Sequence, residues 1–558
     1  MHSQAEMIQL SLNFRKRFPF YHNATPMVYL DSAATTQKLD KVVSAVHDFS
    51  SKRNASVHRG AYPLANAATK EYERARNEVA HLISANEASE IVFTSGATES
   101  INLIANGLDK AQLNGNKILI CESEHHANIL PWQALAKRLG MQISILKLDR
   151  CRRSGLVFTE TTFQRWLSQI DDDTAILACA HVSNVLGVIY PVPSLCEQAS
   201  RVGALSVIDG TQAVAHMLVN VQHIGCDFYV FSGHKMYAPT GVGVCWGKYE
   251  RLEALSPSKL GGEMVSKVSF SGYTAQPPPL KFEAGTPNIL GVIGLREAAR
   301  FIRENTQDIQ AHETQLLGYT LAKLKALSIN CFSYSSVRSD ERAEHSHIGI
   351  ISFVPIDVDS DALAHSLYAK DIALRYGQHC AMPLVDALGM KACLRISLAC
   401  YNTQADIDQF VDALERAINE LKSLANSDQL EPQDAENAWE QHLKDANNWS
   451  EKHRQLLLLS KQLPSLPNAL RNKDSEVHGC EAQVWLKKQG DTLCAHSDSK
   501  TVRGILAVLL LKHQALASAD RKRFDYSQYL RELGLENYFS AGRKDGIRNI
   551  INRLEQGA

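Results

Sequence analysis

Five short apolar runs in the first half of the chain are each followed at once by a polar cluster that could do chemistry. The clusters are TSGATE (94–99), ESEHHAN (122–128), HVSN (181–184), DGTQ (209–212) and SGHK (232–235). They combine hydroxyl groups, carboxylates, histidines and a lysine. In an open α/β sheet, ligands bind beyond the carboxyl ends of the strands. We therefore expect the five clusters to meet at one edge of a sheet.

The apolar runs have the length and composition of buried strands. We expect strands at Ile91–Phe93, Ile118–Cys121, Ala175–Ala178, Leu205–Ile208 and Phe228–Phe231. Helical patterns lie between them, for example at Glu99–Leu108 and Pro193–Arg201. Strands that alternate with helices predict βαβ units and a mostly parallel sheet, here over residues about 25–290.

The pattern changes after residue 290, where a smaller α+β lobe is expected. Its predicted elements are two helices, a strand and a long last helix, at Gly294–Glu304, Glu313–Leu327, Ile348–Phe353 and from Thr403. Residues 425–445 hold six acidic residues, one lysine and a proline, which predicts an exposed linker that is partly helical near its end. Residues 446–558 are predicted to form a separate unit.

Three of the clusters carry groups that suit one cofactor. TSGATE offers backbone amides and a helix N-terminus to a phosphate, although an ordinary helix cap would also explain it. Asp209 ends an apolar strand, where a carboxylate needs a cationic ligand or a salt bridge. Lys235 follows another apolar strand, where a lowered pKa lets a lysine form a Schiff base; a surface lysine is the alternative.

Together, a phosphate cup, a carboxylate for a pyridinium nitrogen and a reactive lysine predict a site for pyridoxal 5'-phosphate (PLP). His125 could stack on its ring, while Asn184 and Gln212 could donate hydrogen bonds to it. The run Gly241-Val-Gly243 is not a dinucleotide-binding motif, because the third glycine is absent at the required spacing.

The composition argues against several classes of protein. Among 558 residues, 59 Lys and Arg balance 60 Asp and Glu, which disfavours a nucleic-acid binder or a polybasic membrane protein. No apolar stretch approaches the ~20 residues of a membrane span, and the N-terminus lacks a secretory signal pattern, so we expect a cytoplasmic protein. Twelve cysteines without a Cys-x-x-Cys pair predict neither a disulfide scaffold nor a metal site.

Residues 1–424 resemble the group II cysteine desulfurases of the SUF and CSD type, in the aminotransferase class V family of fold-type I PLP enzymes. The motifs that carry the resemblance are YLDSAATTQ (29–37), SVHRGAY (56–62), EHHANILPWQ (124–133), HVSNVLG (181–187), DGTQA (209–213), SGHKMYAPTGVG (232–243), FEAGTPN (282–288), RYGQHCAMP (375–383) and LRISLACYNT (394–403). The resemblance implies a large α/β domain over about 25–290, a small domain from 1–24 with 291–424, and a homodimer that acts on L-cysteine.

The resemblance also assigns roles to single residues. Lys235 matches the PLP lysine, Asp209 the partner of the pyridinium nitrogen, and His125 the stacking residue and proton shuttle. The phosphate contacts match Thr98, Ser232, His234 and, from a second subunit, Thr286. The residues that match substrate-binding or flanking positions are Asn184, Arg395, His58 and Arg375.

Cys380 matches the nucleophile that takes up sulfur, in a polar segment where Arg375 would favour its thiolate. A small buried thiol is the alternative. The chain departs from many relatives at Ala97, where they have a second threonine. This change removes one hydroxyl contact to the phosphate and leaves the backbone amide.

Residues from about 448 to the end resemble the SufE family of sulfur acceptors. The resemblance is carried by LPSLP (463–467), GCEAQVWL (479–486) and SDSKTVRGILAVLL (497–510). It implies that Cys480 accepts persulfide sulfur from Cys380, near the basic Arg503, and passes it to an iron–sulfur scaffold or another thiol protein. On chemistry alone, Cys480 could equally be a buried thiol. The alternatives are a selenocysteine lyase for the first part and a docking scaffold for the second.

Overall fold

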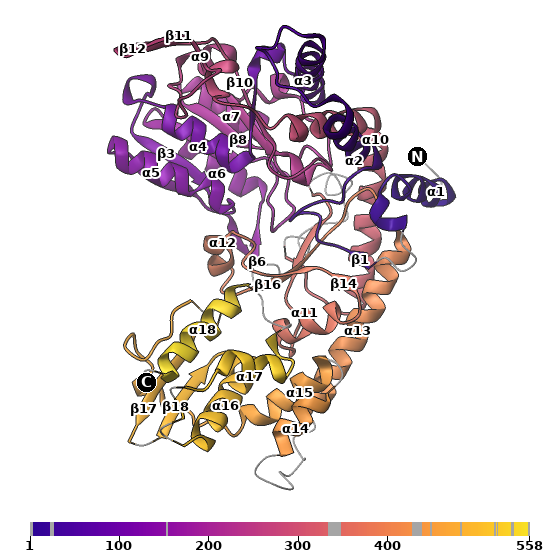
Figure 1. Cartoon of the computed structure of the whole chain (residues 1–558), viewed down its shortest axis with the longest axis vertical. Coiled ribbons are helices and arrows are strands. Elements are labelled where there is room, and N and C mark those ends of the chain that lie inside the picture. Colours follow the sequence, from indigo (N-terminus) through magenta and orange to yellow (C-terminus); the bar gives the residue numbers. More distant parts are fainter. Residues whose placement is uncertain are drawn as a thin grey trace. The chain divides into compact units, whose positions relative to one another are not determined.

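The computed structural model describes residues 4–22, 27–151, 155–332, 347–426, 438–446, 449–479, 482–490, 492–517, 520–521, 523–536 and 541–555. The chain divides into two compact units (Figure 1). Unit 1 comprises residues 1–354 and 373–411, and unit 2 comprises residues 355–372 and 412–558.

A seven-stranded sheet forms the centre of unit 1. Its strand order is β2-β10-β9-β8-β7-β3-β4. The bounds are β2 Ile91–Thr94, β3 Lys117–Cys121, β4 Gln142–Leu146, β7 Thr174–Ala180, β8 Leu205–Asp209, β9 Phe228–Ser232 and β10 Gly243–Gly247. Six strands run in the same direction, and β10, which is antiparallel to both β9 and β2, is the exception. The mostly parallel sheet predicted from the alternation of strands and helices is confirmed.

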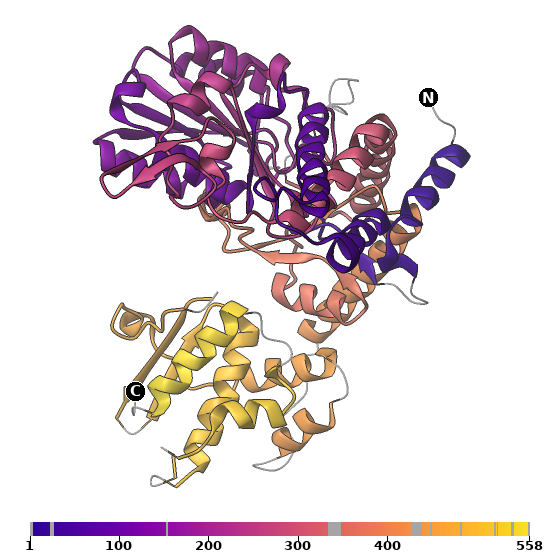
Figure 2. The same cartoon turned by 45° about the horizontal axis from the view of Figure 1, so that its top comes forward.

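Helices cover both faces of this sheet (Figure 2). The helices of unit 1 are α1 Gln4–Arg15, α2 Asp40–Asp48, α3 Pro63–Leu82, α4 Ala97–Gly107, α5 Leu130–Leu139, α6 Glu160–Gln169, α7 Val192–Arg201, α8 Val221–Ile224, α9 Tyr249–Ala254, α10 Ile289–Ala326 and α12 Met382–Ala387. Successive strand side chains alternate between two cores, as a pleated strand requires. Ile118 and Ile120 of β3 pack with Trp132 of α5, whereas Leu119 packs in the core that contains Leu195 of α7.

The two helices predicted at 294–304 and 313–327 are one continuous helix, α10, of 38 residues. The stretch between them, 305–312, contains neither glycine nor proline, so no residue there breaks a helix. Its polar residues bond within the helix instead. Asn305 Nδ2 donates to the carbonyl of Phe301 and Thr306 Oγ1 to that of Ile302, each at 2.7 Å.

The smaller lobe of unit 1 contains a three-stranded antiparallel sheet in the order β13-β16-β15. The bounds are β13 Ile350–Phe353, β15 Arg375–Gly377 and β16 Cys393–Ser397. Two-stranded pairs form from β1 Val28–Tyr29 with β14 Ile372–Ala373, from β5 Asp149–Cys151 with β6 Gly155–Val157, and from β11 Val265–Ser269 with β12 Gly272–Ala275.

Unit 2 has its own hydrophobic core. Its elements are α11 Ser360–Tyr368, the greater part of α13 Gln404–Asn426, α14 Ala438–Asp445, α15 Trp449–Ser460, β17 Val484–Gln489, β18 Thr492–Ser497, α16 Lys500–Ala515, α17 Tyr526–Glu532 and α18 Ala541–Glu555. The end of the segment predicted as a linker is helix α14, and its Leu443 is fully buried in this core. Residues 427–437 of that segment lie outside the described part of the chain. Among the described residues, no helix has the length and apolar character needed to span a membrane.

Candidate active site

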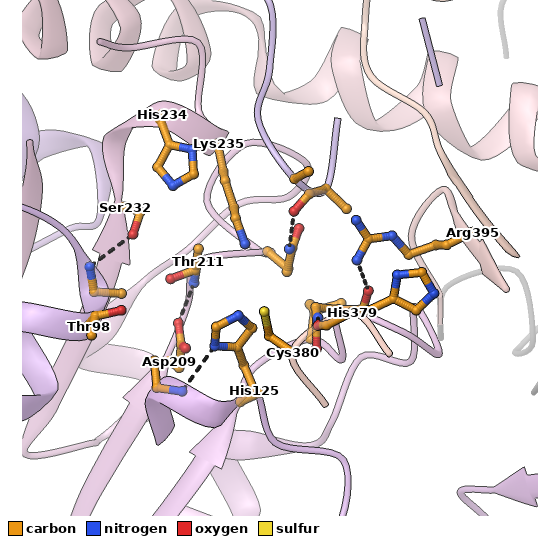
Figure 3. Close-up of a pocket in the computed structure, with 18 of the residues that line it drawn as sticks. Thr98, His125, Asp209, Thr211, Ser232, His234, Lys235, His379, Cys380 and Arg395 are labelled. Carbon is orange, nitrogen blue, oxygen red and sulfur yellow. Dashed lines mark hydrogen bonds between the residues drawn. The ribbon is translucent and has the colours of Figure 1, made fainter. Parts of the chain in front are cut away.

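A cavity of about 270 Å³ opens at the carboxyl ends of the parallel strands in unit 1 (Figure 3). All five polar clusters contribute to its wall. They supply Ala97, Thr98, His125, Ala127, Asn184, Asp209, Thr211, Gln212, Ser232, His234 and Lys235, and the smaller lobe adds Arg375, His379, Cys380 and Arg395. The structure thus brings together side chains from both lobes of unit 1 around one space.

Lys235 ends the short helical turn Gly233–Lys235 directly after β9. Burial lowers the pKa of its amine to about 8, and the positive charge of Arg395 acts in the same direction. About a tenth of the amine is therefore neutral at pH 7, far more than for an ordinary lysine, and the neutral amine is the form that attacks a carbonyl group. Figure 3 shows the Lys235 amine, the His125 ring and the Cys380 thiol extending into the same space.

Asp209 is the last residue of β8 and is buried. Its Oδ1 accepts a hydrogen bond from the backbone N–H of Thr211 at 2.9 Å. Burial raises the pKa of this carboxyl group, while Thr211 and the charge of Lys235 oppose the rise. A buried carboxylate with one described donor is best satisfied by a cationic group in the cavity. The Thr211 hydroxyl beside it is buried and has no hydrogen-bond partner.

His125 lies at the start of the turn that follows β3. Its Nδ1 accepts a hydrogen bond from the Ala127 N–H at 3.1 Å, so a neutral ring carries its proton on Nε2. Burial lowers the pKa of His125 to about 4, with a further contribution from the charge of Lys235. The imidazole is therefore neutral at physiological pH and can exchange a proton through Nε2.

One end of the cavity has the features of an anion site. Ala97 begins α4, and its N–H donates to Ser232 Oγ at 2.9 Å. The positive end of the helix dipole favours a phosphate here. Gly243 of β10 packs against this loop, because a Cβ at that position would lie 2.4 Å from the Cα of Gly96. The glycine run that does not fit a dinucleotide motif thus has a packing role.

Two arginines lie at the other end, around Asp31. Arg395 is buried; its Nη1 donates to the carbonyl of Asn184 at 2.9 Å and its Nη2 lies 3.4 Å from Asp31. Its Nε has no hydrogen-bond partner. Burial lowers the pKa of Arg395 to about 10. Arg375 is half-exposed and bonds Asp31 at 2.8 Å. A planar guanidinium with an unpartnered donor suits a carboxylate ligand.

Cys380 is exposed, whereas the nine other cysteines whose side chains are described are buried. The buried-thiol alternative for Cys380 is therefore wrong. It does hold for Cys393 and Cys400: burial raises the pKa of Cys393 to about 12 and that of Cys400 as well. These two thiols stay protonated, while Cys380 is open to a reaction partner.

Two predicted residues do not line the cavity of the single chain. His58 bonds Glu73 Oε1 at 2.9 Å and lies 3.2 Å from Glu263. Thr286 is exposed on the surface. Conversely, Thr211 and His379 line the cavity, although sequence reasoning assigns no role to either residue. Both stand inside quoted motifs beside predicted site residues, which is the signal that could have identified them.

Cys480 lies outside the described residues, but the segment before it is described. Gly479 has φ 87°, a conformation that favours glycine. Asn549 of α18 donates to the carbonyl of His478 at 2.9 Å. Arg553, one turn later in α18, donates to the carbonyls of Glu476, at 2.7 Å, and Asp474. Helix α18 therefore fixes the backbone that leads to Cys480.

Comparisons with known proteins agree with this geometry. Residues 28–410 match the family model for aminotransferase class-V, and residues 437–558 match that for SufE, described as an Fe-S metabolism associated domain. The second match begins inside the segment predicted as a linker, and the predicted boundary at 446 stays a prediction.

Relatives of the first part are named cysteine desulfurases. A probable cysteine desulfurase of Halalkalibacterium halodurans is 41% identical over 407 residues, which cover 72% of this chain and 96% of the relative. One of Vibrio cholerae is 40% identical over 413 residues, covering 73% and 98%.

Solved structures give the same result. The cysteine desulfurase CsdA of Escherichia coli, in an S-sulfonic acid form, superposes with a TM-score of 0.64 at 37% identity, covering 74% of this chain and 99% of that one. A cysteine desulfurase of Thermococcus onnurineus gives 0.67 at 33% identity, covering 75% and 99%. The chain belongs to the aminotransferase class-V family, and it carries a SufE domain at its C-terminal end.

Proposed function

We propose that the chain is a PLP-dependent L-cysteine desulfurase joined to its own sulfur acceptor. The observation that carries the proposal is the single cavity lined by Lys235, Asp209, His125, Arg395 and Cys380. Each of these groups has a task in removing sulfur from cysteine, and relatives over the same residues bear the name cysteine desulfurase.

The residues of the cavity fit PLP. Lys235 would hold its aldehyde and Asp209 its pyridinium nitrogen. The phosphate would lie at the start of α4, beside Thr98, Ser232 and His234. The buried Thr211 hydroxyl, which has no partner, and the Gln212 amide are further donors in the same wall. Bound there, PLP supplies an electron sink that allows the carbon–sulfur bond of cysteine to break.

Lys235 and His125 are the groups that would move protons. The lowered pKa of Lys235, about 8, lets its amine accept and release a proton near neutral pH. His125 is neutral and carries its exchangeable proton on Nε2. Arg395 and Asn184 would bind the carboxylate of the substrate, and Arg375 would lie at the entrance.

Cys380 would take the sulfur atom. In the balanced reaction, cysteine and the Cys380 thiol yield alanine and a Cys380 persulfide: the Cβ–S bond of the substrate breaks, and an S–S bond to Cys380 forms. The Cys480 thiol would then attack the outer sulfur, which gives a Cys480 persulfide and restores the Cys380 thiol. The outer sulfur would next pass to an iron–sulfur scaffold or another thiol protein.

We also propose a homodimer in which Thr286, exposed in the single chain, contacts the PLP phosphate of the second subunit. His58 would flank the substrate. The ten cysteines whose side chains are described carry free thiols, which supports a cytoplasmic location, because the cytosol keeps thiols reduced.

Visible absorbance of the purified chain tests the proposal. The parent chain should be yellow and should convert cysteine to alanine, while Lys235→Ala and the charge-preserving Lys235→Arg should be colourless and inactive. Lys137→Ala, at an exposed lysine of α5, is the matched control and should keep both properties. A colourless parent chain, or alanine formation by Lys235→Ala at the parent rate, would contradict the proposal.

A further inference from the structure

The turn that carries Cys380 has a backbone conformation that side chains disfavour. His379 has φ 53° and Cys380 has φ 54°, and neither is a glycine. Two consecutive residues in the left-handed region persist only where the surroundings hold them. The bonds around the turn therefore decide where the thiol lies.

Hydrogen bonds from separate elements hold this turn. Asn184 Nδ2, after β7, donates to the carbonyl of His379 at 2.8 Å. The His379 ring bonds the carbonyl of Cys393 through Nε2 at 3.1 Å. On the far side of the turn, the contacts come from the loop after β3, through His126.

His126 bonds the backbone at Cys380 and two residues after it. Its backbone N–H donates to the carbonyl of Cys380 at 2.7 Å. Its ring Nε2 lies 3.0 Å from the N–H of Met382 and accepts from it. A neutral ring that accepts at Nε2 carries its proton on Nδ1. The backbone N and the ring Nε2 of His126 therefore both hold the backbone of residues 380–382 against the loop after β3.

The two adjacent histidines have separate places in the site. His125 lines the cavity, and His126 is not among the residues that line it. Because His126 follows His125 directly, any shift of the Cys380 turn relative to this loop changes the distance between the thiol and the proton-carrying ring. His126 thus connects the two reacting groups through one peptide unit.

We propose that His126 is a positioning residue for sulfur transfer, which holds the Cys380 turn against the loop of His125 through the hydrogen bond between its Nε2 and the Met382 N–H. The proposal rests on the proposed desulfurase function. It concerns the transfer of sulfur to Cys380 and leaves the binding of cysteine untouched.

The test separates these two events in the full chain. Binding is followed by the change in visible absorbance when cysteine is added, and transfer is followed by mass spectrometry of the Cys380 persulfide in a single turnover. His126→Phe keeps the ring and removes the acceptor. It should slow persulfide formation about tenfold, since small displacements of a reacting group have effects of this order or larger, and it should leave the absorbance change within about twofold.

Two further variants keep the proposal falsifiable. His126→Gln, whose Oε1 can accept in place of Nε2, should restore most of the transfer rate. Met382→Pro removes the donor of the same bond at the first residue of α12, where proline is tolerated. It should slow transfer as His126→Phe does, and the double variant should be no slower than either single one, since both remove the same bond.

Three results would overturn the proposal. They are persulfide formation at the parent rate in His126→Phe or Met382→Pro, an equal loss of cysteine binding and transfer, and no recovery in His126→Gln. Failure of the proposed function is distinguishable, because the parent chain itself would then form no persulfide on Cys380.

Discussion

The segments that carry the two sulfur-handling cysteines of the proposed relay are held in different ways. The Cys380 turn is bonded by Asn184 and His126, which come from loops after two different strands, and it borders a cavity that contains charged groups. The segment that ends just before Cys480 is held by helix α18, through Asn549 and Arg553, and by strand β17, whose Val484 carbonyl accepts from the Val477 N–H at 2.8 Å.

The difference matches what each cysteine has to do. A thiol that attacks a substrate held by a cofactor needs one fixed position relative to both. An acceptor thiol needs only to reach a persulfide sulfur, so bonds from neighbouring elements of its own unit suffice. The first arrangement links several parts of unit 1, and the second lies within unit 2.

The largest expected effect concerns the direction of sulfur transfer from Cys380 to Cys480. Cysteine that carries a labelled sulfur atom follows this transfer. Cys380→Ser should carry label on neither residue, because the acceptor receives sulfur only from Cys380. Cys480→Ser should keep label on Cys380 and lose it from the C-terminal unit. Digestion followed by mass spectrometry locates the label. Label on Cys480 in Cys380→Ser would show that the acceptor takes sulfur independently.

Arg395→Lys tests whether binding of cysteine depends on the guanidinium group of Arg395 or on its positive charge alone. Lysine cannot replace the planar guanidinium with its unpartnered Nε. Hydrogen bonds to charged groups contribute about 1.5–3 kcal/mol, so KM for cysteine should rise about 10- to 100-fold, with a smaller change in kcat. Steady-state alanine production measures both. The control is Arg375→Lys, at a half-exposed position, where a smaller effect is expected; an equal rise in KM would contradict the role of Arg395.

The lowered pKa of Lys235 predicts that its reaction with PLP levels off at a lower pH than that of an exposed lysine. In the cofactor-free chain, the neutral amine should increase about tenfold per pH unit up to about pH 8 and then level off, since the pKa is lowered to about 8. The rate of PLP uptake should follow this curve, whereas the reaction of N-acetyl-lysine methyl amide with PLP should keep accelerating up to about pH 10. An uptake rate that still rises steeply above pH 9 would contradict it.

The same shift has a consequence for stability. Between pH 8 and the ordinary lysine pKa of about 10.4, the folded cofactor-free chain binds fewer protons at Lys235 than the unfolded chain does. The contribution of Lys235 to the free energy of unfolding therefore rises with pH across this window. Urea unfolding of the parent chain and of Lys235→Met at pH 8 and pH 10 should show the larger rise in the parent chain.

Asn549→Ala tests the segment that ends just before Cys480, and it has the smallest expected effect. It removes one neutral hydrogen bond to the carbonyl of His478, which contributes about 0.5–1.5 kcal/mol. Labelling of Cys480 should slow about 2- to 10-fold, while labelling of Cys380 is unchanged. Arg548→Ala, at an exposed neighbour on α18, is the matched control. Equal slowing in both variants would contradict a specific role for Asn549.

Much of unit 1 could be predicted from local sequence. The five strands were found because each is a short apolar run with a polar cluster after it, and a parallel sheet carries such clusters to one edge. The sequence does not predict α10 as a single helix, because polar residues such as Asn305 and Thr306 weaken the helical pattern. In the structure, their side chains bond carbonyls of the same helix.

The remaining differences come from contacts between distant parts of the chain. The bond between His126 and Met382 joins residues that are 256 positions apart, and no spacing rule indicates it. Thr211 and His379 acquire a place in the cavity only when their turns fold beside Asp209 and Cys380. His58 and Thr286 were predicted from resemblance to a dimeric family, and the cavity of one chain does not contain them.

The exposure of Cys380 has a consequence for where the sulfur goes. A persulfide formed on an open turn can be reduced by any small thiol in solution, which would release sulfide and waste the turnover. A tethered acceptor meets it at an effective concentration of about millimolar, so it competes with dissolved thiols without needing a tight docking contact. Fusion of the two units would thus protect a cell from free sulfide as much as it would speed delivery.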